Sequence, residues 1–466
     1  MKEECGVFGI FNHLDASQMV YLGLYSLQHR GQESAGIAVS NRDRICNFRR
    51  MGLVSDIFKP KVIKKLTGSI AIGHVRYSTS GFSIERNAQP FSVFYDKGPI
   101  AVSHNGNISN AFKVRQDLEK EGAIFQTMLD SEIIVHLLAK QQGNDLAQNL
   151  INSLNQLQGA YSFLVMTEDK LIAARDPWGF RPLCLGKLGG SYVVSSETCA
   201  FDLIGAKYLR EVEPGELVVI SDEGLKSYDI NKAEKSQYCI FEHIYFARPD
   251  SVVFGKSVQA VRKKLGRELA KEFPADVDIV IPVPDSGNYA AYGYAEQSGI
   301  PFEMGFVRNH YVGRTFIKPN QSDRSFAVKV KLNPVKDIIK GKRIVVVDDS
   351  IVRATTSKLR VDALREAGAK EVHLRISAPP ITNSCFFGID TPEKNRLIAA
   401  NNTVEEIQAF LGVDSLGYIS IEGLNLAVGD VDKFCLACFT GEYPLPVEED
   451  KDKLHLENTT QIDFDF

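Results

Sequence analysis

Two neighbouring carboxylates, Asp348 and Asp349, follow a run of apolar residues in the segment RIVVVDDSIVRATTSK (Arg343–Lys358). The apolar run predicts a strand that carries both aspartates to its C-terminal end, and residues 350–356 predict a loop that opens a helix. Unpaired N–H groups at a helix N-terminus bind anions, and the loop hydroxyls can hydrogen-bond a phosphate. Two adjacent carboxylates suit sugar hydroxyls or a magnesium ion. The alternative is a capped helix after a strand, without a ligand.

The centre of this segment, VVVDDSIVRATT, resembles the phosphoribosyl pyrophosphate signature of the type I phosphoribosyltransferases. The resemblance implies that Asp348 and Asp349 lie at a Mg²⁺ site. It also implies substrate contacts from the loop residues Ser350, Arg353, Ala354, Thr355 and Thr356. That family usually has glycine where Ala354 stands, because glycine tolerates positive φ and a close phosphate. An alanine held in the left-handed region costs roughly 1 kcal/mol.

A second reactive group, the Cys5 thiol, opens the apolar run CGVFGI near the start of the chain. Taken alone, Cys5 is compatible with a buried structural cysteine. A thiol can also attack a carboxamide and form a thioester, which releases ammonia. If Cys5 were the first residue, its own α-amine, with a pKa of roughly 7.7–8, could act as the general base. That hypothesis predicts removal of residues 1–4 as a propeptide and an unprocessed chain that does not hydrolyse glutamine.

Four downstream segments follow Cys5 in a fixed order and bear on its role. They are LQHRGQESAG (Leu27–Gly36), GHVRYSTSG (Gly73–Gly81), HNGNISN (His104–Asn110) and LDSE (Leu129–Glu132). Together with Cys5 they resemble the N-terminal-nucleophile class of glutamine amidotransferases. The resemblance implies that Cys5 is the nucleophile and that Asn105 and the Gly106 N–H form the oxyanion hole.

The same resemblance implies how the substrate glutamine is held. Arg76 would bind its α-carboxylate as a bidentate pair, and Asp130 would bind its α-ammonium. The alternative for Arg76 and Asp130 is an ordinary ion pair. His104 and Asn107 are expected to brace the loop rather than to react. Leu129 replaces a small polar residue that is usual before the aspartate.

The two resemblances together indicate the glutamine phosphoribosylpyrophosphate amidotransferase family, over nearly the whole chain. The segment Val283–Pro301 implies that Ser286 lies near the magnesium ion, and Val307–Arg324 implies a loop that closes over the substrate with Arg314 and Lys318. The implied reaction transfers ammonia from glutamine to phosphoribosyl pyrophosphate and gives phosphoribosylamine, glutamate and pyrophosphate, the committing step of purine synthesis. The motif RDPWGFRPL (Arg175–Leu183) is compatible with either a structural or a functional role.

Four cysteines outside the first half form a further candidate site: Cys239, Cys385, Cys435 and Cys438. A single CxxC pair with two distant cysteines fits a zinc site, an iron–sulfur cluster or plain buried thiols. Iron–sulfur members of the family carry cysteines in these segments, so the resemblance implies a [4Fe–4S] cluster. Cys46, Cys184 and Cys199 are expected to be ordinary residues.

The elements that must position these groups divide the chain in two. Residues 5–235 alternate short β-rich runs with turns and a few amphipathic helices, which predicts two packed sheets with helices outside them. Residues 236–466 contain continuous apolar runs followed by helices, which predicts a parallel α/β domain. The resemblance implies an αββα N-terminal-nucleophile hydrolase domain followed by a type I phosphoribosyltransferase domain. It also implies feedback inhibition by purine nucleotides and a homotetramer.

Composition limits the function classes further. The chain has 466 residues, 8 cysteines and a net charge of −4. The charge gives no reason to expect a nucleic-acid or membrane partner, and no run reaches the roughly 20 apolar residues of a membrane span. We therefore expect a cytoplasmic protein with two domains and reduced cysteines.

Two rival functions use the same motifs differently. An amidotransferase that acts on a sugar phosphate or on aspartate would share the first half, but the VVVDDSIVRATT loop argues against it. A regulatory protein that binds phosphoribosyl pyrophosphate without catalysis is the second rival. The presence of Cys5, Asn105 and Gly106 argues against that protein, and a turnover assay with glutamine distinguishes it from an enzyme.

Overall fold

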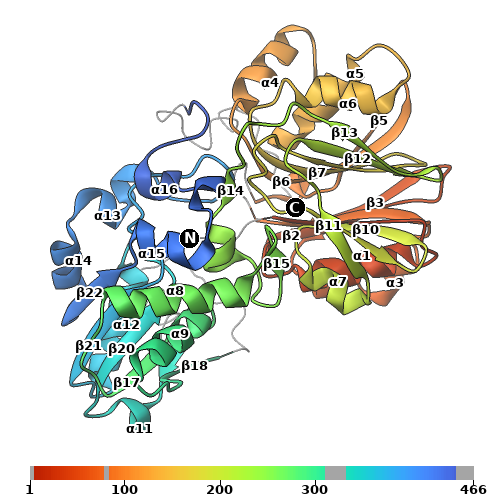
Figure 1. Cartoon of the computed structure of the whole chain (residues 1–466). Coiled ribbons are helices and arrows are strands. Elements are labelled where there is room, and N and C mark those ends of the chain that lie inside the picture. The colour runs from red at the N-terminus through yellow and green to blue at the C-terminus, as the bar shows by residue number, and fades with distance from the viewer. Residues whose placement is uncertain (1–4, 78–82, 310–331, 448–466) are drawn as a thin grey trace.

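The computed structural model describes residues 5–77, 83–309 and 332–447. Within these ranges the chain forms two lobes, one from each half of the sequence (Figure 1). None of the helices in the described ranges combines the length and the hydrophobicity that crossing a membrane requires.

The N-terminal lobe has four layers, in the order helix, sheet, sheet, helix (Figure 1). Both sheets are antiparallel; the described residues give one sheet in the order β11-β9-β10-β1-β4-β2-β3 and one in the order β13-β12-β8-β7-β6-β5. The strands of the first sheet are β1 (Gly6–Phe11), β2 (Ser34–Ser40), β3 (Ile45–Met51), β4 (Ile70–Arg76), β9 (Cys184–Leu188), β10 (Ser191–Ser195) and β11 (Lys207–Glu211). Those of the second are β5 (Phe91–Tyr95), β6 (Gly98–Ile108), β7 (Gly159–Met166), β8 (Leu171–Arg175), β12 (Glu216–Ser221) and β13 (Gly224–Asp229).

Helices cover the outer face of each sheet. The first sheet is covered by α1 (Ala16–Ser26), α2 (Val54–Ile57), α3 (Pro60–Ile63) and α7 (Cys199–Ile204), and the second by α4 (Ala111–Lys120), α5 (Ile133–Ala139) and α6 (Leu146–Leu154). The packing of β1 on both of its faces explains why its whole sequence is apolar. Phe8 and Ile10 pack with α1, whereas Val7 and Phe11 pack between the sheets, because successive side chains point to opposite faces. A strand buried on both faces therefore reads as a continuous hydrophobic run.

The C-terminal lobe is built on a parallel sheet in the order β17-β20-β21-β22. Its strands are β17 (Ile279–Pro282), β20 (Arg343–Asp348), β21 (Glu371–Ile376) and β22 (Ser415–Tyr418). The longer helices around it are α8 (Val258–Glu272), α9 (Asn288–Ser298), α12 (Thr355–Glu366), α14 (Val404–Leu411) and α15 (Ile421–Val428). Smaller pieces are β15 (Val252–Val253), β16 (Lys256–Ser257), β18 (Phe306–Arg308), β19 (Leu332–Pro334), α11 (Lys336–Ile339) and α13 (Ile398–Asn401).

A short parallel pair joins the beginning and the end of this lobe. Strand β14 (Tyr238–Cys239) pairs with β23 (Phe434–Cys435), with Cys239 opposite Cys435. A π-helical turn, Glu242–Phe246, follows β14, and α16 (Ala437–Thr440) follows β23. The chain start and the chain end of the lobe are thus held together beside the first lobe (Figure 1).

The predicted fold class, two packed sheets followed by a parallel α/β domain, is confirmed. The predicted strand, loop and helix around Asp348 match β20 and α12, and Gly368, with φ +92°, follows the C-cap residue of that helix. Strand β3 lies at a sheet edge, is only half buried and carries three polar or charged residues in seven, so its apolar signal is weak.

Candidate functional site

Cys5 lies at the centre of the first sheet, immediately before β1. Its side chain is buried, its Sγ donates to the Tyr77 carbonyl at 3.3 Å, and its own carbonyl accepts from Arg30 Nε at 3.0 Å. Burial raises the pKa of the Cys5 thiol to about 11, although the Tyr77 contact and the Arg76 charge act in the opposite direction. In the described part of the chain no side-chain base hydrogen-bonds this thiol. A protonated thiol is a weak nucleophile, so Cys5 needs a base from elsewhere.

Strand β6 of the facing sheet carries Asn105 and Gly106. Asn105 is buried, and its Nδ2 has no hydrogen-bond partner among the described residues. A buried donor without a partner costs about 1–3 kcal/mol, and such a group is retained where a ligand completes it. Gly106 has φ +147°, and a Cβ there would lie 2.1 Å from the Ala160 carbonyl oxygen, so only glycine fits.

Asp130, one of the two charged residues predicted to bind glutamine, contacts β6. Its carboxylate lies 3.4 Å from His104 Nδ1 and accepts from the Ile108 N–H at 3.0 Å. Burial alone would raise the pKa of Asp130, but His104 and backbone N–H groups hold it below its usual range, so the group is ionised at neutral pH. The charge of Arg76 lowers the pKa of the Cys5 thiol and that of Asp130 raises it.

The unusual Leu129 and the motif residue Asp176 both have structural explanations. Leu129 is buried in the core under α5 and anchors the turn that presents Asp130. Asp176 accepts from the backbone N–H groups of Trp178 at 3.0 Å and Phe180 at 3.3 Å, so it shapes a turn. Of the RDPWGFRPL motif, Arg181 reaches the other lobe: its Nε donates to the Phe387 carbonyl at 3.0 Å.

The two aspartates of the second lobe lie at the C-terminal end of β20. Asp348 accepts from Arg360 Nη1 at 2.6 Å, and Asp349 accepts from Ser286 Oγ at 2.5 Å and from Ser350 Oγ at 2.6 Å. Ser286 follows β17, the neighbour of β20, so the two loops converge at one edge of the sheet. Burial raises the pKa of Asp348 to about 7, and Asp349 adds to this effect while Arg360 opposes it. A cation bound at this edge of the sheet would stabilise the ionised form of Asp348.

The loop after Asp349 ends at the N-terminus of α12. Ala354, the residue before this helix, has φ +57° and ψ −12°, in the left-handed region that favours glycine. Arg353, Thr355 and Thr356 flank it at the helix start, where the Thr355 N–H donates to the Arg353 carbonyl at 2.8 Å. The N–H groups in the first turn of a helix are the groups that bind anions. Arg314 and Lys318 lie outside the described residues.

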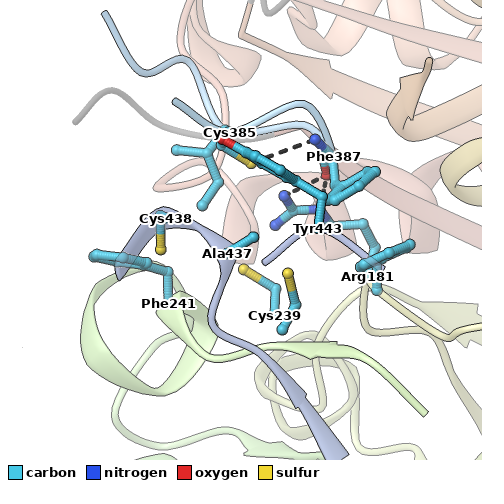
Figure 2. Close-up of a pocket in the computed structure, with 11 residues that line it drawn as sticks. Arg181, Cys239, Phe241, Cys385, Phe387, Ala437, Cys438 and Tyr443 are labelled. Atoms are coloured by element: carbon cyan, nitrogen blue, oxygen red, sulfur yellow. Dashed lines mark hydrogen bonds between the residues drawn. The ribbon is translucent and has the colours of Figure 1, made fainter. Parts of the chain in front are cut away.

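The four candidate cysteines line one cavity between the lobes (Figure 2). It encloses about 340 Å³ of space between atoms, part of it open to solvent. Cys239 and Cys435 come from the β14–β23 pair and Cys438 from α16, whereas Cys385 belongs to a loop held to Cys438 by backbone hydrogen bonds of 3.0 Å. Burial raises the pKa of the Cys435 thiol to about 12.

The cavity contains the four thiols that the resemblance assigns to an iron–sulfur cluster. Over the ranges that the structure covers, no three His, Cys, Asp or Glu side chains converge closely enough to hold one metal ion. In a four-iron cluster each thiolate binds a different iron, so the sulfurs surround a larger body. The Phe387 N–H donates to Cys385 Sγ at 3.3 Å, a contact that favours a thiolate at that position.

Sequence reasoning missed a buried ionic network around Arg30. Arg30 Nη1 contacts Glu197 at 2.6 Å and Nη2 contacts Glu242 at 2.7 Å, with all three side chains inaccessible to solvent. The signal was available: Glu242 stands inside the apolar run IFEHIYF, and a buried acid in such a run requires a cationic partner. Arg360, the partner of Asp348, was missed for a different reason, because a basic residue on a helix surface is common.

Comparisons with known proteins cover both lobes. Residues 74–202 match a glutamine amidotransferase domain and residues 255–382 a phosphoribosyl transferase domain. The chain is 51% identical to amidophosphoribosyltransferase 2 of Arabidopsis thaliana, over 97% of this chain and 81% of that protein. It is 49% identical to the amidophosphoribosyltransferase of Bacillus subtilis, over 97% and 96% of the two chains.

Solved structures agree over the same length. The glutamine phosphoribosylpyrophosphate amidotransferase of B. subtilis, complexed with ADP and GMP, matches with a TM-score of 0.92 and 48% identity. The match covers 97% of this chain and 100% of that one. A structure titled as the allosteric regulatory enzyme of purine biosynthesis matches with a TM-score of 0.93 and 48% identity, over 98% of this chain and 99% of that one.

Proposed function

This chain belongs to the amidophosphoribosyltransferase family, and on that premise we propose that its two lobes perform the two halves of one reaction. The first lobe hydrolyses the amide of glutamine to glutamate and ammonia. The second lobe lets that ammonia displace pyrophosphate from phosphoribosyl pyrophosphate, which gives 5-phosphoribosylamine for purine biosynthesis. The observation that carries this assignment is the unpaired, buried Asn105 Nδ2 in the sheet that faces Cys5.

We assign the glutaminase step to Cys5, Asn105 and Gly106. Removal of residues 1–4 frees the α-amine of Cys5, which takes the thiol proton that the buried site otherwise retains. The thiolate attacks the amide carbon, and the oxyanion forms next to the Asn105 Nδ2 and the Gly106 N–H. Two such donors are worth several kcal/mol in a site shielded from water. Ammonia leaves with the proton, and water then hydrolyses the thioester to glutamate.

We assign glutamine binding to two charges beside that centre. Asp130, ionised and fixed by His104 and the Ile108 N–H, would bind the α-ammonium. Arg76, buried at the end of β4, would bind the α-carboxylate through its guanidinium fork. Opposite charges at the two positions fix the orientation of the amide relative to Cys5.

We assign phosphoribosyl transfer to the sheet edge at Asp348 and Asp349. The loop of Ser350, Arg353, Ala354, Thr355 and Thr356 would bind the substrate phosphate with the N-terminal N–H groups of α12. Asp348, Asp349 and Ser286 supply the oxygen ligands that Mg²⁺ prefers, and the ion, when bound, neutralises charge on the leaving pyrophosphate. Arg314 and Lys318 would cover the substrate from the loop outside the described residues.

We further propose that Cys239, Cys385, Cys435 and Cys438 hold a [4Fe–4S] cluster. The four thiols come from three chain segments and line one cavity, and a backbone N–H faces Cys385 Sγ. The cluster would be structural, because it joins β14, the Cys385 loop and α16 at the contact between the lobes.

The remaining expectations concern processing, regulation and assembly. We place the domain boundary at residues 235–236, in the stretch between β13 and β14, and treat residues 1–4 as a propeptide. The ADP and GMP bound to the B. subtilis relative support feedback inhibition of this chain by purine nucleotides. A homotetramer is expected from the family.

Purified protein tests the proposal in one preparation. Mass spectrometry should find Cys5 as the N-terminal residue, and chemical analysis should find about four irons and four sulfides per chain. Phosphoribosylamine should form from phosphoribosyl pyrophosphate with either glutamine or ammonia as nitrogen source. A processed, cluster-loaded protein that binds phosphoribosyl pyrophosphate but turns over neither nitrogen source would instead be a regulatory binding protein.

A further inference from the structure

Strand β6, which carries the proposed oxyanion donors Asn105 and Gly106, contacts a loop of the second lobe. Asn107, the residue after Gly106 in β6, donates from Nδ2 to the carbonyl of Phe386 at 2.8 Å. A Cβ built on Gly388 would lie 3.2 Å from the carbonyl carbon of Gly106, so the backbones are in close contact. Asn107 thus contacts the second lobe one residue from Cys385.

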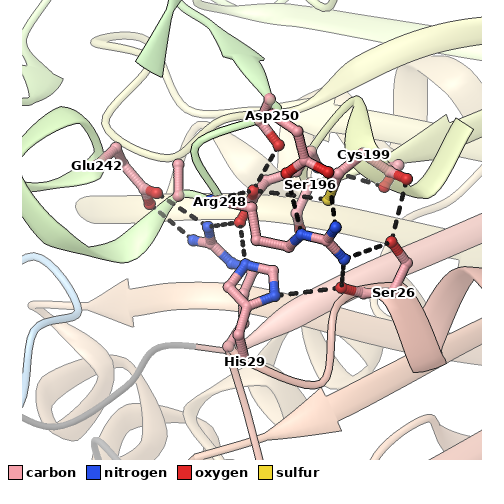
Figure 3. Close-up of polar contacts among 12 residues, drawn as sticks. Ser26, His29, Ser196, Cys199, Glu242, Arg248 and Asp250 are labelled. Atoms are coloured by element: carbon pink, nitrogen blue, oxygen red, sulfur yellow. Dashed lines mark hydrogen bonds and ion pairs between the residues drawn. The ribbon is translucent and has the colours of Figure 1, made fainter. Parts of the chain in front are cut away.

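Cys5, the proposed nucleophile, is also linked to the second lobe, through the side chain of Arg30. Arg30 is fully buried; its Nε donates to the Cys5 carbonyl at 3.0 Å, and its Nη1 and Nη2 donate to Glu242 at 2.9 and 2.7 Å. Glu242 begins the π-helical turn three residues after Cys239. Figure 3 shows Glu242 within the polar contacts that link the lobes.

Arg181 connects the loop after Cys385 with Glu242. Its Nε and Nη2 donate to the Phe387 carbonyl at 3.0 and 2.6 Å, and its Nη1 lies 3.5 Å from Glu242. The ring of Phe387 stacks on Phe180 with centroids 4.4 Å apart. The loop after Cys385 and the turn after Cys239 therefore hold each other through a side chain of the first lobe.

We propose that Asn107 is a positioning residue for glutamine hydrolysis, which makes the glutaminase rate depend on the seating of the Phe386–Phe387 loop. This inference rests on the proposed function of Cys5 and Asn105. The physical reason is that an oxyanion donor acts only within a few tenths of an ångström of its target, and Asn105 and Gly106 have no freedom to correct a displaced strand.

The test replaces one hydrogen-bond donor and leaves both catalytic centres intact. Asn107→Asp keeps the side-chain size but cannot donate, and Asn107→Leu removes the donor without adding charge. Both variants should lose about tenfold or more in kcat with glutamine, because the oxyanion is less well stabilised in the transition state. The KM for glutamine and the ammonia-dependent rate should stay unchanged. Asn110→Asp is the matched control, since Asn110 donates at 2.9 Å to Gln156 within the first lobe.

Two further measurements separate positioning from general damage. Iodoacetamide labelling of Cys5, followed by peptide mass spectrometry, should proceed at the wild-type rate, because the thiol and its base are untouched. Iron and sulfide content should also be unchanged. Wild-type kcat in either Asn107 variant overturns the proposal, and so does an equal loss with glutamine and ammonia. If wild-type protein itself uses no glutamine, the proposed function fails instead.

Discussion

The two active centres differ in what their polar groups do before a substrate arrives. In the first lobe, Asn105 Nδ2 is buried and unpaired, and Asn105 lies on β6, next to the edge strand β5 of its sheet. In the second lobe, Asp348 and Asp349 are already occupied by Arg360, Ser286 and Ser350. The first centre is therefore built to receive charge, whereas the second must exchange internal partners for ligands.

This difference follows from the elements that carry the residues. β5 pairs with the first part of β6, Gly98–Val102, whereas Asn105 lies opposite Ser162 of β7. The backbone at Asn105 is therefore held by the sheet, and its buried donor does not relax into another contact. The aspartates stand at the open edge of a parallel sheet, where loops supply partners until a ligand replaces them. A site on a rigid strand can keep a polar group without a hydrogen-bond partner, whereas a site made of loops supplies such partners from its own residues.

The largest expected effect separates the centres completely. Cys5→Ala removes the only nucleophile proposed for glutamine, so glutamine-dependent synthesis should fall by roughly 10⁴-fold or more, as in other nucleophile deletions. Ammonia-dependent synthesis should persist, because the second lobe is unaffected. Both rates are measured by product formation with each nitrogen source. Loss of both activities would contradict the division of labour between the lobes.

The reciprocal change acts on the loop-based centre. The double substitution Asp348→Asn and Asp349→Asn removes two negative ligands, which should lower phosphoribosyl transfer by about 10³-fold, equivalent to several kcal/mol of metal-assisted stabilisation. Glutamine hydrolysis, followed as glutamate release, should continue. Unchanged product formation from ammonia would exclude this loop from the mechanism.

A smaller effect tests whether the unpaired amide is catalytic. Asn105→Ala should reduce kcat for glutamine by about 10²–10³-fold, the usual cost of one oxyanion donor. Because the donor acts on the transition state, the KM for glutamine should change little. The same variant should be slightly more stable in urea, since a buried unsatisfied group is gone. A variant with a raised KM and a normal kcat would show that Asn105 binds the substrate rather than the oxyanion.

The smallest effect concerns strain in the phosphate loop. Ala354→Gly should raise the free energy of unfolding by less than about 1 kcal/mol, because relief of the left-handed strain is partly offset by greater freedom of the unfolded chain. Ala367→Gly is the matched control: Ala367 has φ −74°, so glycine there should destabilise the protein. Urea unfolding of the two variants gives the comparison. Equal destabilisation by both changes would show that φ +57° carries no strain.

The sequence predicted the function and the fold class of this protein, but it did not predict the contacts between the two lobes. Asp348 and Asp349 were placed correctly at a strand end because an apolar run and a helix start have local signatures. The fold class was also predicted correctly. That the Asn105 amide lacks a partner depends on its surroundings in three dimensions, so no sequence pattern reveals it.

The contacts between lobes were beyond reach for a related reason. Arg30 and Glu242 are 212 positions apart, and their pairing is decided by how two folded units meet. Asn107 is predicted to support the loop rather than to react, and its partner Phe386 lies 279 positions away. Local periodicity contains no information about such pairs. The roles of the individual site residues remain predictions.

The β14–β23 pair has a consequence for how the enzyme comes into being. Translation produces Cys5 and β6 early, whereas Phe386 and the Phe434–Cys435 strand are synthesised only near the end. On the proposed assignment, a nascent chain contains Cys5 and β6 long before it contains the second-lobe segments that contact them. We therefore expect glutamine hydrolysis to begin only after the second lobe has been synthesised.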